Sequence, residues 1–171
     1  DGDYVRPMRW MKEANWLDDT FGETFMLKFQ LVHSHQSTYP HRDNNGTDTH
    51  IKLLCGMVLV ATWSQADGDA HGLTDAVEIE KLQDTCDLVD WERLSQMPSG
   101  RIFLLRKGDV LVMPSGTYHY VYTVRTKVAI AGDFISPIGW ERRVASVARD
   151  FDMKFVKGKA DGHVDLAELV E

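Results

Sequence analysis

The chain has 171 residues, of which 43% are hydrophobic and 26% are charged, and its formal net charge is −7 at pH 7. This length suits one domain with a substantial core, and the composition is typical of a globular rather than a disordered protein. No run of about 18 apolar residues predicts a membrane-spanning helix. No cluster of Lys and Arg predicts direct binding to nucleic acid.

The first 63 residues predict a helix, a strand, a long turn and a second, bent strand. Residues 7–18 carry Trp and Met at helical spacing. Residues 23–34 alternate, which predicts a half-buried strand, and residues 36–49 are rich in turn formers. Residues 50–63 form a long apolar run that Gly56 interrupts once, so we expect a bent strand there. The apolar face of the first strand would consist of Phe25, Leu27, Phe29 and Leu31.

The remaining elements are an excursion, three strands and a closing helix. Residues 64–98 are acidic and polar with a helical period over residues 75–95, which predicts an excursion off the main sheet. Residues 101–106 and 109–113 predict two strands joined by a tight turn, and residues 118–130 predict a third strand. Residues 138–151 predict an amphipathic helix. Strands in the middle with helices at both ends favour a β-barrel with helical additions.

Two histidines and one carboxylate are spaced as metal ligands. His41 and Asp43 follow a strand, and residues i and i+2 of an extended chain point to the same side, so both can bind one cation. His119 follows the turn Pro114-Ser115-Gly116 and opens a strand. Two His and one carboxylate match the facial triad of non-haem Fe(II) oxygenases. An H-x-D triplet alone is common in surface turns, and it is the order of strand, triplet, turn, long strand, hairpin and second His that makes the pattern specific.

From about Phe25 to Arg149 the sequence resembles the JmjC domains, the Fe(II)- and 2-oxoglutarate-dependent oxygenases that include histone lysine demethylases and protein hydroxylases. The resemblance is closest to the histone demethylase branch, where a Thr three residues before the first ligand His is usual. It implies a mainly β fold, a double-stranded β-helix (jelly-roll or cupin barrel) with flanking helices. The segments that carry it are residues 38–43 (TYPHRD), 46–47 (GT), 107–119 (KGDVLVMPSGTYH) and 130–134 (IAGDF).

The same resemblance implies one domain over residues 1–171. Its core would span about residues 23–150, with a helical excursion at about 64–98 and a closing helix at about 138–151. The N-terminus lacks the layout of a signal peptide, so an intracellular location is expected. The choice between nucleus and cytoplasm stays open, and the nucleus is implied by the resemblance alone.

The chemistry implied by the resemblance is oxidative. His41, Asp43 and His119 would ligate Fe(II), 2-oxoglutarate would chelate the metal, and Thr38 would bind its distal carboxylate. Hydroxylation of a C–H bond on a protein side chain would follow. On an N-methyl group, as in methyl-lysine of a histone tail, the product would release formaldehyde.

Two positions depart from the family pattern. The Lys that usually neutralises 2-oxoglutarate falls at residues 56–59, which contain no Lys, and a buried carboxylate needs a partner. Lys52 is one candidate because it shares a face with Val58 if the strand is regular. Lys127 is another because it alternates onto the face of His119. Asp133 stands where the family has Asn, and it could pair with either Lys.

Because of these departures, two other interpretations of the function stay open. The first is a catalytically inactive JmjC-like domain that serves as a binding or scaffold module. The second is a cupin that uses the triad for another metal reaction, although such cupins usually bring more His to the metal. The acidic charge would suit a basic peptide partner, but it more often only maintains solubility.

Several other side chains carry expectations. Cys55 lies in an apolar run and is expected to be a small buried residue, which fits a reducing compartment. Trp140 is expected to anchor the closing helix in the core. Four tyrosines either form an aromatic wall for a methylated amine, through cation–π attraction, or pack in the barrel. They are Tyr39, Tyr118, Tyr120 and Tyr122.

Overall fold

The computed structural model describes residues 27–43, 46–73 and 91–157. The expected helix at residues 7–18 and the middle of the excursion lie outside the described residues. Alternating and β-branched residues form the strands, as their packing on a pleated surface favours. The strands are β1 (Leu27–Val32), β2 (Ser37–His41), β3 (Asp48–Trp63), β4 (Arg101–Arg106), β5 (Val110–Met113) and β6 (Tyr118–Phe134).

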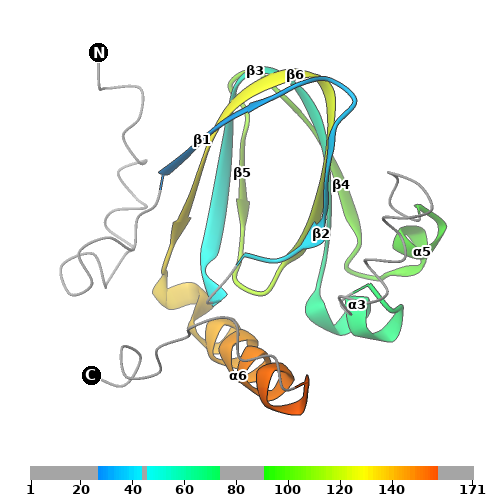
Figure 1. Ribbon diagram of the computed structural model, residues 1–171, viewed down its shortest axis with the longest axis vertical. Coiled ribbons are helices and arrows are strands. Elements are labelled where there is room, and N and C mark those ends of the chain that lie inside the picture. Colours follow the sequence, from blue (N-terminus) through cyan, green and yellow to red (C-terminus); the bar gives the residue numbers. More distant parts are fainter. Residues whose placement is uncertain (1–26, 44–45, 74–90, 158–171) are drawn as a thin grey trace.

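The strands form one antiparallel sheet that folds back on itself (Figure 1). The two long strands, β3 and β6, pair along most of their length. β2 pairs with the first half of β6 and β4 with the second half of β3, whereas β1 and β5 pair with the opposite halves. Two four-stranded layers result, β2-β6-β3-β4 and β1-β6-β3-β5. This topology confirms the mainly β double-stranded β-helix, the cupin-type fold.

A single glycine allows β3 to pass from one layer to the other. Gly56 has a φ of +93°, and the pairing of β3 with β6 shifts register on both sides of it, between Leu53 and Val58. A Cβ at residue 56 would come within 2.4 Å of the carbonyl oxygen of Thr126 on β6. Only glycine satisfies both the backbone angle and the close approach. The bend expected at Gly56 is therefore confirmed.

Apolar side chains gather in two separate clusters. One fills the space between the two layers, where each fully buried aliphatic side chain contributes roughly 1.5–3 kcal/mol. It consists of Ile51, Leu53, Val58, Val60, Leu105, Met113, Val121 and Ala129. The other consists of Ala61, Trp63, Leu73, Leu94, Met97, Tyr118 and Tyr120. This second cluster joins the barrel strands to residues of the excursion.

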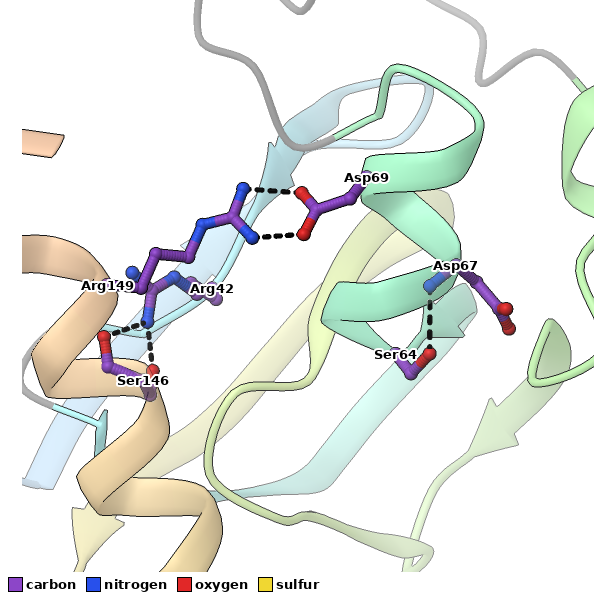
Figure 2. A network of polar contacts seen from close by, with 6 residues as sticks. All are labelled: Arg42, Ser64, Asp67, Asp69, Ser146 and Arg149. Atoms are coloured by element: carbon purple, nitrogen blue, oxygen red, sulfur yellow. Dashed lines mark hydrogen bonds and ion pairs between the residues drawn. The ribbon is translucent and has the colours of Figure 1, made fainter. Parts of the chain in front are cut away.

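Two short helices of the excursion are described, α3 (Gln65–Ala70) and α5 (Trp91–Gln96). Ser64 caps α3, since its hydroxyl oxygen accepts the backbone N–H of Asp67 (Figure 2). The chain leaves β6 through the 3-10 turn η3 (Pro137–Gly139) and enters α6 (Trp140–Lys157). The closing helix therefore starts two residues later than expected and continues six residues further.

Two arginines tie α6 to the rest of the molecule (Figure 2). Arg149 forms a bidentate ion pair with Asp69 of α3. Arg42, the middle residue of the H-x-D triplet, donates to the carbonyl oxygen and the hydroxyl of Ser146. Its guanidinium lies 5.9 Å from the ring centroid of Tyr118. The segment that carries His41 and Asp43 is thus anchored to α6 through the side chain between them.

Three expectations about burial were wrong. On β1 the apolar residues Phe29 and Leu31 are 70% and 64% exposed, whereas Lys28 and Gln30 line an internal cavity. The polar face of β1 points inward because that cavity is polar. Cys55 is exposed, since its part of β3 lies at the irregular bend. Trp140, the first residue of α6, is 45% exposed. Among the described residues, no helix is long and apolar enough to cross a membrane.

Candidate metal centre

Three side chains converge where the strands of one layer end. His41, at the end of β2, is the direct cross-strand partner of His119, at the start of β6. Their imidazole centroids are 4.2 Å apart, and Asp43 follows two residues after His41. One potential ligand atom from each of His41, Asp43 and His119 lies within 4.8 Å of the others. A single cation can therefore contact all three.

Backbone carbonyls orient both imidazoles in the same way. Nδ1 of His41 lies 2.7 Å from the carbonyl oxygen of Tyr39, and Nδ1 of His119 lies 3.5 Å from that of Thr117. Because a carbonyl oxygen only accepts, each Nδ1 carries the proton and donates it. The Nε2 lone pairs are then the ones available to a metal, in the arrangement common among metal-binding histidines.

Burial keeps one of these imidazoles neutral. Desolvation and the nearby charge of His41 lower the pKa of His119 from 6.5 to about 4. At neutral pH this side chain therefore presents a lone pair rather than a positive charge, as metal ligation requires. The donor set of two imidazoles and one carboxylate fits a divalent transition metal such as Fe(II).

A threonine and a second carboxylate support Asp43. The hydroxyl of Thr49 on β3 lies 2.5 Å from Oδ2 of Asp43 and 3.1 Å from Oδ1 of Asp133 on β6. The other carboxylate oxygen of Asp133, Oδ2, accepts a hydrogen bond from the ammonium of Lys28 on β1, at 3.0 Å. Asp133 thus pairs with Lys28, and the partners expected for it, Lys52 and Lys127, are not used. Sequence reasoning missed Thr49 and Lys28, although the alternation of Lys28 with apolar residues could have indicated an inward-facing polar position.

The three converging side chains line a small cavity of about 80 Å³ between the two layers. Lys127 lines it too and is only 2% exposed. Desolvation alone lowers the pKa of Lys127, because among the described residues no carboxylate pairs with its ammonium. The remaining lining residues are Lys28, Gln30, Thr38, Thr49, Ile51, Val60, Met113, Val121, Ala131 and Asp133.

The structure thus brings Thr38, Lys127 and Asp133 to the cavity of the triad, and Lys52 stays outside. Lys52 is exposed because Ile51 faces inward and adjacent strand residues alternate. The expectation that Lys52 shares a face with Val58 was wrong, since the register shifts around Gly56 change the alternation. Val58 is completely buried in the core.

The aromatic wall is not formed at this cavity. Tyr118 and Tyr120 belong to the second apolar cluster and Tyr122 packs against it. These three tyrosines therefore match the alternative expectation, that they pack in the barrel. Tyr39 is partly exposed and does not line the cavity. Residues 118, 120 and 122 alternate with His119 and Val121, which face the cavity, so their rings point to the other side of β6.

A larger cleft of about 650 Å³ lies on the side of β4 and β5. Its walls include Trp63 at the end of β3, Phe103 on β4 and Arg142 on α6. Met113 lines both this cleft and the cavity of the triad.

No protein-family model matches the chain, and no curated protein matches it. Solved structures of similar fold include a conserved protein of unknown function from Streptococcus pyogenes, at 12% identity and a TM-score of 0.41, with 66% of this chain and 65% of that chain covered. The cupin domain of Drosophila melanogaster CENP-C has 12% identity and a TM-score of 0.41, with 63% and 59% covered. A cupin superfamily protein from Desulfitobacterium hafniense has 10% identity and a TM-score of 0.42, with 67% and 70% covered. The chain spans less than two thirds of the first two structures, and likeness at this level concerns the fold alone.

Proposed function

We propose that the chain is an Fe(II)- and 2-oxoglutarate-dependent oxygenase that acts on a protein side chain. The observation that carries this proposal is the buried ammonium of Lys127. An unpaired buried charge is costly, and a fold retains it where a ligand of opposite charge binds. The ammonium lines the same cavity as His41, Asp43 and His119, so it suits an anion that also reaches the metal.

The charges of the cavity support a dicarboxylate co-substrate. Fe(II), the carboxylate of Asp43, the ammonium of Lys127 and the two carboxylates of 2-oxoglutarate sum to zero. Asp133 adds no net charge because Lys28 neutralises it. Charge balance of this kind is what a small, mostly desolvated site requires.

The residues then divide by role. His41, Asp43 and His119 hold the metal through two imidazole nitrogens and one carboxylate oxygen. Lys127 binds the distal carboxylate of 2-oxoglutarate, and the hydroxyl of Thr38 donates to it. Ile51, Val60, Met113 and Val121 line the cavity with apolar surface that excludes water. Fe(II) with 2-oxoglutarate and O₂ supplies oxidative decarboxylation coupled to hydroxylation of a C–H bond.

The substrate we propose is a protein or peptide, with methyl-lysine of a histone tail as one case. The resemblance to the demethylase branch supports this choice, and a nuclear location would follow from it. The larger cleft of about 650 Å³, which shares Met113 with the cavity of the triad, is the candidate binding surface for such a polypeptide.

A catalytically inactive binding domain is the second candidate. The absence of Lys from residues 56–59 and the presence of Asp133 in place of Asn favour it. Under this alternative the metal triad persists, but 2-oxoglutarate does not bind or does not turn over.

The test is calorimetric titration of 2-oxoglutarate into the Mn(II)-loaded protein without oxygen, with His119→Ala as the control. The oxygenase proposal expects micromolar, metal-dependent binding, about −8 kcal/mol. It also expects succinate from 2-oxoglutarate when Fe(II) and O₂ are supplied. Binding without succinate, or metal loading without binding, would favour the inactive domain.

A further inference from the structure

We propose that Thr49 is a positioning residue for Asp43, and that Lys28 and Asp133 keep it in that role. This inference rests on the metal site proposed above. Thr49, Asp133 and Lys28 orient the metal-binding side chain of Asp43 before the metal binds.

Asp43 needs such support because no strand fixes it. β2 ends at His41, so Asp43 lies beyond the last cross-strand pair and is not part of a strand. Both histidines, in contrast, lie on paired strands. A carboxylate on irregular backbone rotates freely unless a side chain holds it, and ligands must be held close to the productive geometry.

Thr49, on the opposite layer of the barrel, fixes the orientation of the Asp43 carboxylate. It is buried, and its backbone is fixed on both sides because it pairs with Met113 of β5 and Asp133 of β6. Its hydroxyl approaches Oδ2 of Asp43 at 2.5 Å. This bond occupies one carboxylate oxygen and leaves Oδ1 as the free donor to a metal.

The hydroxyl has one proton but touches two carboxylates. The distance to Asp133 is 3.1 Å, against 2.5 Å to Asp43, so the geometry assigns the proton to Asp43. Asp133 is satisfied instead by the ammonium of Lys28 at 3.0 Å. Lys28 also offsets the repulsion between the two acids. Lys28, a half-exposed residue on the edge strand β1, thereby acts on a metal ligand through Asp133 and Thr49.

The experiment compares Mn(II) affinity, measured by calorimetry without 2-oxoglutarate, in four variants. Thr49→Val removes the hydroxyl at nearly constant volume, and Thr49→Ser keeps it. Thr123→Val makes the same change at another buried threonine, on β6 and outside the cavity. Lys28→Met removes the exposed cation that pairs with Asp133. Thermal unfolding of each metal-free variant is recorded in parallel.

We expect Thr49→Val to weaken Mn(II) binding by roughly 10–100-fold, as loss of a group that orients a ligand does. Thr49→Ser and Thr123→Val should stay close to the parent. Lys28→Met should weaken binding by only about two- to fivefold, the effect of one half-exposed ion pair. A Thr49→Val variant that loses thermal stability but binds Mn(II) as the parent does would overturn the positioning role and leave the proposed function standing. A parent chain that binds no Mn(II) would overturn both.

Discussion

Replacement of Lys127 by Met should have opposite effects on stability and on ligand binding. In the free protein Lys127 is 2% exposed and burial lowers the pKa of its side chain, so this buried charge destabilises the fold. Met has similar length and no charge. Substituting well-packed apolar groups for buried ionic ones is neutral or stabilising by about 1–4 kcal/mol. For a chain of this size each kcal/mol raises the Tm by about 2–4 °C.

The same substitution should remove the partner of the co-substrate. Loss of one member of a buried ion pair costs about 3–5 kcal/mol, which corresponds to an affinity lower by on the order of a hundredfold or more. Calorimetry on the Mn(II)-loaded variant measures the affinity for 2-oxoglutarate, and circular dichroism measures the Tm of the metal-free variant. Lys52→Met is the matched control, because Lys52 is exposed on β3 and does not line the cavity.

The Lys127→Met variant should be at least as stable as the parent and should not bind 2-oxoglutarate. A variant that is clearly less stable would show that the ammonium already has a partner in the free protein. Loss of 2-oxoglutarate binding in Lys52→Met but not in Lys127→Met would refute the assignment of the counter-charge.

Two further predictions concern the fold and its pH dependence. The pKa of His119 is lowered to about 4 in the folded, metal-free protein. The folded state excludes a proton that the unfolded state binds below pH 6.5. The contribution of neutral His119 to the free energy of unfolding is therefore complete above pH 6.5 and is lost as the pH falls toward 4. Urea denaturation should show that the free energy of unfolding falls by about 2–3 kcal/mol between pH 7 and pH 4.5 in the parent, but not in His119→Gln. Equal decreases in both proteins would contradict a buried, neutral imidazole at residue 119. Gly56 and Gly108 have φ values of +93° and +94°, but a Cβ meets Thr126 only at residue 56. Gly108→Ala should cost about 1–2 kcal/mol and Gly56→Ala clearly more, and similar costs in urea denaturation would disprove the close approach.

The sequence was most informative where the signal is local. Residues i and i+2 share a side in any extended segment, so His41 and Asp43 could be paired before the fold was known. The Pro-Ser-Gly turn likewise placed His119 at the start of a strand. The bend at Gly56 followed from one glycine within an apolar run.

Features that depend on contacts across the barrel could not be predicted. Lys52 and Lys127 were equivalent candidates, because Gly56 indicates a bend in β3 but not how the register shifts around it change the alternation. The outward position of Phe29 depends on Lys28 and Gln30 facing a polar cavity. Thr49 meets Asp43 only because the two layers face each other.

The contact between Arg42 and Ser146 has a consequence for the order of events during synthesis. The H-x-D segment is synthesised before its outer anchor on α6, which lies 104 residues further along the chain. Contacts of such separation close late in folding because the entropy of the intervening loop must be lost first. The metal is therefore expected to join a barrel that is already assembled, and to be the last component added rather than the nucleus around which the chain folds.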